Sequence, residues 1–178
     1  MNEPEVMKNN STSSTVNSPA HTEAATPMWQ ENLYSLAGIA LGMGIVSFIS
    51  IYFEVLYLIP ALASSAIMLF MSYNNVFAQP RNVVGGHLMA VLAAIIVSQF
   101  AGPEWWAVTI VAVLTALLMI VTHTIHPPGG GTAIVAFIGC YSPSALIISV
   151  LLGTVIMVLT AVVVNNAISS RKYPLFWI

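Results

Sequence analysis

Six runs of apolar residues follow one another along this chain, separated by short polar, glycine-rich or proline-rich breaks. The runs cover roughly residues 33–53, 55–73, 83–101, 105–125, 129–142 and 144–166. A helix needs about 20 apolar residues to cross a bilayer, so the first, third, fourth and sixth runs predict full spans. The second run contains Pro60 and the polar pair Ser64 and Ser65, and the fifth is short. These two runs predict interrupted segments.

The two halves of the chain resemble each other when one is shifted by 67 residues. The shift aligns Pro60 with Pro127 and Ser65 with Thr132. Each half then holds three segments, the middle one short, and an odd number of crossings inverts the second half relative to the first. The sequence therefore predicts an all-α polytopic membrane protein of two inverted three-segment repeats. The predicted halves cover residues 33–98 and 100–165.

Polar residues flank this predicted transmembrane domain, which spans residues 33–168. Residues 1–32 are rich in Asn, Ser, Thr and Glu, a composition that predicts a disordered tail. Residues 169–178 predict a short cytoplasmic C-terminal tail. The N-terminal segment has neither the basic start of a secretory signal nor the arginines of a transit peptide. We therefore expect the protein to enter the membrane through its own first span.

Composition narrows the class of protein. The chain is 58% hydrophobic and 6% charged, whereas soluble domains are about a quarter charged. The net charge of −2 carries no message about nucleic acid, and because the sequence shows no basic patch we expect no nucleic-acid partner. The single cysteine, Cys140, excludes an intrachain disulfide and a thiolate metal cluster. We find no catalytic arrangement and no nucleotide loop, and we expect neither an enzyme nor a cofactor.

The few basic residues predict the orientation. With six crossings, Arg81 and the pair Arg171 and Lys172 lie on one side of the membrane, so the positive-inside rule places both termini in the cytoplasm. Without a transit-like tail we expect the inner (plasma) membrane of a bacterium. A chain of 178 residues is small for a complete pathway, so we also expect a homo-oligomer in the lipid bilayer.

The sequence His-Thr-Ile-His-Pro-Pro-Gly-Gly-Gly-Thr at residues 123–132 interrupts the apolar pattern. In a bilayer, such non-helical backbone survives only where protein or water surrounds it. A helix that begins here would leave its first N–H groups unpaired, and the helix dipole favours an anion at that end. The alternative is a proline kink whose glycines serve close packing. The predicted substrate-binding residues of this segment are His126, Pro127, Gly129, Gly130, Gly131 and Thr132.

Residues outside this segment complete the predicted site. Ser64 and Ser65 would contribute hydroxyls from the matching segment near Pro60, and Arg81 would attract anions at the cytoplasmic mouth. Asn82 is predicted as the helix N-cap of the third span.

Three histidines, His87, His123 and His126, suggest further chemistry. Imidazoles can donate hydrogen bonds to an anion, pass protons, or hold a divalent metal. We place His87 with His126 at the anion site and assign no metal site, because only Glu54 could join the three rings as an acidic ligand.

At this point two motifs resemble those of a known family. His126-Pro127-Pro128 followed by three glycines, Thr and Ala resembles the signature of the HPP family of membrane proteins, and residues 78–87 are similar to its second recurrent stretch. The resemblance covers about residues 35–170. It implies a small-anion transporter with nitrite as the leading substrate, because cyanobacterial and chloroplast members are associated with nitrite transport. The family is usually described with fewer spans than the six predicted segments.

Two other functions stay open at the level of sequence. A divalent-metal or proton-coupled carrier built on the three histidines predicts that metal is retained after purification. A non-transporting membrane scaffold predicts that changes in the motif alter complex formation and leave flux unchanged.

Overall fold

The computed structural model describes residues 27–55 and 57–177, and within these ranges the chain is helical without any strand. This confirms the predicted all-α class. The predicted disordered tail falls mainly on residues 1–26, which lie outside the described residues. The elements are α1 (Met28–Phe53), α2 (Ile59–Met71), the 3-10 helix η1 (Val76–Ala78), α3 (Pro80–Ser98), α4 (Trp105–Val121), α5 (Pro128–Ile138) and α6 (Pro143–Asn166).

Three helices, α1, α3 and α6, are long and apolar enough to cross a membrane, whereas α2, α4 and α5 are shorter. The prediction of a full span over residues 105–125 therefore needs correction. Helix α4 has 17 residues and ends at Val121, because His123 adopts a left-handed backbone conformation with a φ of 54°. The first helix also begins earlier than expected, at Met28 directly after Pro27.

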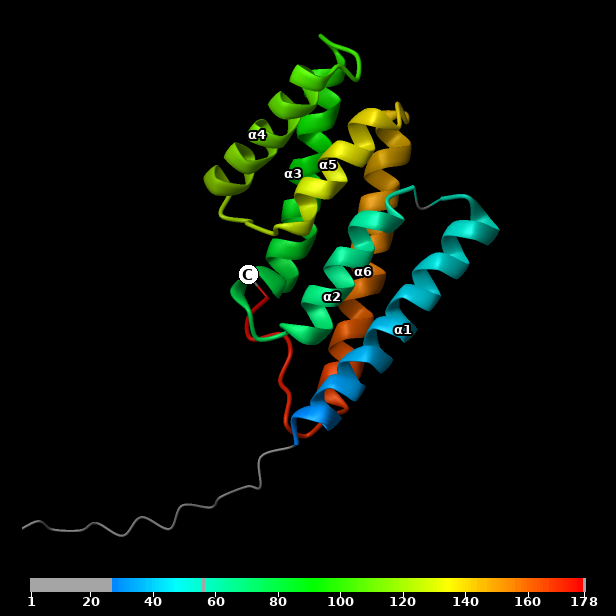
Figure 1. Cartoon of the computed structure of the whole chain (residues 1–178), viewed down its shortest axis with the longest axis vertical. Coiled ribbons are helices and arrows are strands. Elements are labelled where there is room, and N and C mark those ends of the chain that lie inside the picture. The colour runs from blue at the N-terminus through cyan, green and yellow to red at the C-terminus, as the bar shows by residue number, and fades with distance from the viewer. Residues whose placement is uncertain (1–26, 56, 178) are drawn as a thin grey trace, which may run out of the picture.

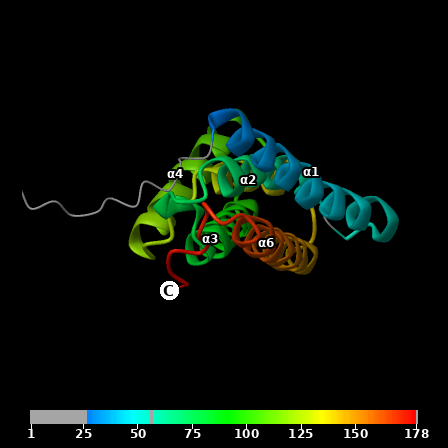
Figure 2. The ribbon, with the colours of Figure 1, turned by 90° about the horizontal axis from the view of Figure 1, so that it is seen from below.

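The helices form a bundle with α1 and α4 on opposite sides (Figures 1 and 2). Helix α1 packs against α2 and α6, and α4 packs against α5 and α3. Helices α2 and α5 touch in the interior, as do α3 and α6. In a repeat, α1, α2 and α3 correspond to α4, α5 and α6. The α1–α2 contact then corresponds to α4–α5 and the α1–α6 contact to α4–α3, while the α2–α5 and α3–α6 contacts each correspond to themselves. The contact pattern thus agrees with a repeat, while the inversion of one half stays a prediction.

Glycines allow α2 to approach α1 and α6 closely. A Cβ atom at Gly38 of α1 would lie 2.3 Å from a ring carbon of Phe70 in α2, and one at Gly42 would lie 3.2 Å from the same ring. At Gly153 of α6 a Cβ atom would lie 2.5 Å from Leu62. Residues without side chains at these three points let α2 sit between α1 and α6, the close packing expected of membrane helices.

The segment after α6 folds back onto the start of α3 (red in Figure 1). Tyr173 is 1% exposed, and its hydroxyl donates a hydrogen bond of 2.9 Å to the Ala78 carbonyl. The backbone N–H of Leu175 donates to Gln79 Oε1 at 2.8 Å. The predicted C-terminal tail is therefore packed against the corner between η1 and α3, which the sequence did not indicate.

Arg171 lies at the centre of a second contact, which we call the Arg171 clamp. Its guanidinium donates to Glu31 Oε2 at 2.8 Å, to Ser35 Oγ at 2.9 Å, to Asn165 Oδ1 at 3.1 Å and to the Phe70 carbonyl at 3.2 Å. The arginine side chain is 2% exposed and the glutamate side chain 27%. The clamp therefore ties α1, α2 and α6 together at the end of the bundle that carries the C-terminal segment.

Candidate functional site

The break between α4 and α5 carries one histidine into the interior. The chain leaves α4 at Thr122, turns at His123, and re-enters a helix at Pro128. Pro127 and Pro128 suit this start, because proline has no N–H group that the first turn would leave unpaired. The result is that His126 is fully buried while His123 stays exposed.

Paired glycines in α3 let this break approach the helix closely. A Cβ atom at Gly86 would lie 2.6 Å from His126 Cβ and 2.9 Å from the Thr124 carbonyl oxygen, and one at Gly85 would lie 2.6 Å from Thr124 Cγ2. A Cβ atom at Gly129 would lie 3.1 Å from the Gly86 carbonyl oxygen. Gly85, Gly86 and Gly129 therefore act through packing, which brings the His126 ring beside α3.

Four side chains then form a continuous series of hydrogen bonds, which we call the imidazole–hydroxyl chain. Thr132 Oγ1 lies 2.5 Å from His87 Nδ1, and His87 Nε2 lies 2.8 Å from Ser65 Oγ. Ser65 Oγ lies 2.9 Å from His126 Nε2, and His126 Nδ1 lies 2.7 Å from the Phe77 carbonyl oxygen. The centres of the two rings are 5.0 Å apart. Helices α5, α3 and α2 and the break thus meet at one point.

The Phe77 carbonyl sets the direction of every bond in this chain when both rings are neutral. A carbonyl only accepts, so His126 Nδ1 carries the ring proton and Nε2 must accept from the Ser65 hydroxyl. Ser65 has one proton, so its oxygen accepts from His87 Nε2–H. His87 Nδ1 then has no proton and accepts from the Thr132 hydroxyl. All the protons point from Thr132 towards Phe77.

The imidazole–hydroxyl chain is buried and lies among helices without charge. Its four side chains are at most 1% exposed. Helices α2, α4, α5 and α6 contain no Asp, Glu, His, Cys, Tyr, Lys or Arg residue. Among the described residues, every buried side-chain nitrogen and oxygen has a hydrogen-bond partner. The site is therefore satisfied as a neutral network, and a charge that formed on it would have no fixed counter-charge.

The structure brings together four of the predicted site residues: Ser65, His87, His126 and Thr132. Three others, Ser64, Arg81 and Asn82, lie outside this chain of hydrogen bonds. Ser64 is exposed, with its hydroxyl 3.5 Å from the Pro60 carbonyl of its own helix. Arg81 is also exposed and donates to the Thr122 carbonyl at 3.4 Å.

Asn82 needs a correction, because α3 begins at Pro80 with Gln79 as the residue before it. Asn82 therefore lies inside the first turn, where its side-chain amide donates to the Val76 carbonyl at 2.8 Å. The prediction that it caps the third span is wrong.

The predicted backbone cradle for an anion also needs correction. The N–H of Gly129 donates to the His126 carbonyl at 2.9 Å, and the N–H of Gly130 donates to the Pro127 carbonyl at 3.0 Å. These two groups are occupied by turns that lead into α5, so they are not free donors. Gly131 and Pro127 are exposed. Hydroxyl and ring N–H groups, rather than the start of the helix, are the donors concentrated at this point.

The three histidines do not form a common metal site. His123 is exposed, and no hydrogen bond links its ring to His87 or His126 in the described part of the chain. Within residues 27–55 and 57–177 there is no group of three or more His, Cys, Asp or Glu side chains that could hold a metal. The geometry therefore does not support the predicted alternative of a carrier with a three-histidine metal site.

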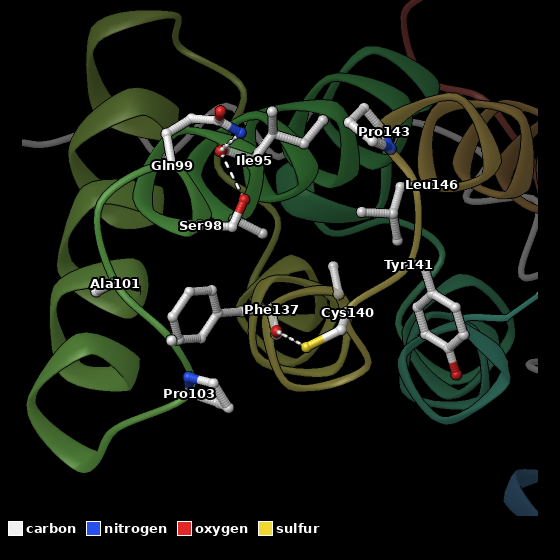
Figure 3. Close-up of a pocket in the computed structure, with 13 residues that line it drawn as sticks. Ile95, Ser98, Gln99, Ala101, Pro103, Phe137, Cys140, Tyr141, Pro143 and Leu146 are labelled. Carbon is white, nitrogen blue, oxygen red and sulfur yellow. Dashed lines mark hydrogen bonds between the residues drawn. The ribbon is translucent and has the colours of Figure 1, made fainter.

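A cavity of about 270 Å³, which no sequence motif predicted, lies at the far end of α5 from the break. Figure 3 shows the ring of Phe137 pointing towards the loop with Ala101 and Pro103, while Tyr141 points to the other side. Ala136, which also lines the cavity, is four residues or about 6 Å along the helix from Thr132. The cavity therefore reaches to about one helical turn from the imidazole–hydroxyl chain. Its lining residues are Ala94, Ile95, Ser98, Gln99, Ala101, Gly102, Pro103, Ala136, Phe137, Cys140, Tyr141, Pro143 and Leu146.

Comparisons with known proteins place this arrangement among membrane proteins. The family described as "HPP, transmembrane region" matches residues 24–174. One transmembrane protein of Dictyostelium discoideum is 34% identical over 128 residues, which cover 67% of this chain and 45% of the relative. A second is 33% identical over 135 residues, or 70% of this chain and 42% of the relative. The chain thus spans less than half the length of these relatives. No solved structure matches it.

Proposed function

The chain belongs to the HPP transmembrane family, and from that premise we propose that it transports a small monovalent anion, with nitrite as the leading substrate. The observation that supports this proposal is the imidazole–hydroxyl chain at the broken helix. It gathers four donor groups, two hydroxyls and two ring N–H groups, in a part of the bundle without acidic side chains; they bond one another and the Phe77 carbonyl here, and an anion would displace one of these acceptors. Nitrite offers only acceptor atoms and no donor, so a site of donors matches its chemistry.

The cavity near Phe137 ends about one helical turn short of this site, and we infer that it marks the mouth from which an anion approaches. Its polar lining comes from Ser98 and Gln99, and its inner wall includes Ala136, one turn from Thr132. An anion that enters there reaches the Thr132 hydroxyl first. Arg81 lies at the opposite end of α3 and would draw the anion to the other mouth. The proposed path therefore runs between these two ends, past His87.

We also propose the bacterial inner membrane, cytoplasmic termini and a homo-oligomer. The basic residues Arg81, Arg171 and Lys172 gather at the end of the bundle where Tyr173 contacts Ala78, and clustered basic residues favour the cytoplasmic side. A second copy is proposed because α1 is largely uncovered within one chain. Native mass spectrometry in detergent would measure the number of copies.

The test of transport is nitrite uptake by proteoliposomes that contain the purified protein. We expect saturable uptake above that of protein-free liposomes. His126→Ala should abolish it while the protein remains folded, because the variant removes the ring that links Ser65 to Phe77. His123→Asn is the matched control, since that histidine is three residues away and exposed and asparagine tolerates its left-handed backbone. This variant should keep wild-type uptake.

Each outcome decides between the proposed functions. Uptake at the wild-type rate in the His126→Ala protein would remove the imidazole–hydroxyl chain from the transport path. Folded wild-type protein without uptake above the liposome background would overturn nitrite transport, and the scaffold function would then be tested by whether the same variants change complex formation.

A further inference from the structure

We propose that the imidazole–hydroxyl chain is a proton relay and that the anion crosses together with a proton. This inference rests on the proposed function and adds a coupled ion to it. The geometry carries it: four bonds of 2.5 to 2.9 Å join Thr132, His87, Ser65, His126 and the Phe77 carbonyl without a gap. Each of the four side chains can both give and receive a proton.

The first step takes up a proton, at the end near the cavity, from a hydronium ion that becomes water. Thr132 Oγ1 receives a proton and passes its own proton to His87 Nδ1, which accepts from it in the neutral chain. One O–H bond forms and one breaks at the hydroxyl, and one N–H bond forms on the ring. His87 then carries protons on both nitrogens and a charge of +1.

The second step moves this charge to the other ring. His87 Nε2 gives its proton to Ser65 Oγ while Ser65 passes its own to His126 Nε2. His87 is again neutral and His126 carries both ring protons. His126 then releases the Nδ1 proton at the Phe77 end to a water molecule, which becomes a hydronium ion. One proton has entered and one has left, no electrons have moved, and reorientation of the rings and hydroxyls restores the first state.

Charge balance explains why the anion and the proton would travel together. A single anion in this core would have no counter-charge, which is costly in a membrane interior. A proton on either ring supplies that counter-charge and makes the occupied site neutral. The Ser65 hydroxyl bridges the two rings, so the positive charge can follow the anion across their 5.0 Å separation.

Among the described residues, these two rings are the only titratable side chains within the imidazole–hydroxyl chain. Helices α2, α4, α5 and α6 and η1 contribute no titratable side chain. On α3 itself, Arg81 is exposed and six residues, or about 9 Å, before His87. The break adds the exposed His123. The C-terminal segment adds Tyr173, whose hydroxyl donates to the Ala78 carbonyl, and Arg171, held by Glu31.

The experiment measures protons and nitrite in the same proteoliposomes. An internal pH dye reports proton entry while nitrite uptake is followed, with valinomycin and potassium preventing a build-up of charge. Protein-free liposomes give the leak of neutral nitrous acid, which is subtracted. Thr132→Val removes the hydroxyl but keeps the shape of the side chain, and Thr132→Ser keeps the hydroxyl. Thr154→Val is the control, because Thr154 is equally buried but bonds to the Val150 carbonyl of its own helix.

We expect one proton for each nitrite in the wild-type protein and in the Thr132→Ser and Thr154→Val variants. Thr132→Val should lower coupled uptake about a hundredfold, the scale of a lost proton-transfer group, while it elutes as folded protein. Wild-type nitrite uptake without proton entry would overturn the relay and leave anion transport standing. Unchanged proton coupling in Thr132→Val would overturn it as well. No wild-type uptake of nitrite would overturn the proposed function itself.

Discussion

The imidazole–hydroxyl chain and the Arg171 clamp are both buried polar networks that join distant segments, and they differ in charge. The clamp pairs a permanent cation with the Glu31 carboxylate at 2.8 Å. The imidazole–hydroxyl chain has two rings that can gain or lose a proton and no bonded carboxylate or ammonium group. An arginine stays protonated at any physiological pH, whereas an imidazole can both bind and release a proton. The first network suits a fixed tie and the second suits a step that changes charge.

The comparison predicts the largest loss of stability at the clamp. Arg171→Met removes the donor of five hydrogen bonds, which go to the Glu31 carboxylate and carbonyl, Ser35 Oγ, Asn165 Oδ1 and the Phe70 carbonyl. Loss of one partner of a buried pair costs about 3 kcal/mol or more. We expect a clearly lower unfolding temperature in detergent and an unchanged dependence of uptake on pH. Lys172→Met, next in the chain and exposed, should change neither quantity. A clamp variant with wild-type stability would show that α1 is held by apolar packing alone.

A smaller effect is expected where α3 meets the break. Gly86→Ala adds a Cβ atom 2.6 Å from His126 Cβ, so the break must move and His126 must leave its position beside Ser65. Overpacking of this kind costs about 2 kcal/mol, and uptake should fall with it. Gly131→Ala is the contrasting variant, because a Cβ atom there would have no neighbour within 4 Å and alanine favours a helix. Equal uptake in the two variants would contradict the assigned role of Gly86.

The smallest change in stability and the largest change in pH response should come from Ser65→Ala. Hydrogen bonds between membrane helices contribute only about 0.6 kcal/mol on average, so loss of this hydroxyl should cost about 1 kcal/mol. The two rings would then have no bridge, and uptake should no longer rise with external acidity. Ser64→Ala, one residue earlier and exposed, is the control. If Ser64→Ala changed the pH profile as much as Ser65→Ala, the response to pH would not depend on the bridge between the two rings, and the imidazole–hydroxyl chain would no longer differ from the clamp in this respect.

The sequence predicted much of the fold because its signals were local. Apolar runs gave the six helices, and the paired prolines placed the break before Pro128 within a residue of the helix start. The repeat aligned Ser65 with Thr132, and these are the two hydroxyls that contact His87. The 67-residue shift between the two halves thus paired two residues that the fold brings to the same histidine.

The remaining parts depend on contacts between residues far apart in the chain. Arg171 reaches Glu31 across 140 positions, and no periodic pattern indicates such a pair. Ser64 and Ser65 are adjacent, and in a helix that is apolar on all sides the sequence cannot indicate which of them faces the interior. The N–H groups of Gly129 and Gly130 bond within the turn, which depends on the backbone path and not on residue type.

The single cysteine of the chain offers a natural label for topology. Cys140 is exposed and lines the cavity at the end of α3, whereas the C-terminal segment lies at the start of α3. A maleimide that cannot cross membranes will therefore react with intact cells only if this cavity opens to the outside. Labelling from outside would place Arg81 and Tyr173 on the cytoplasmic side, and no engineered cysteine is required.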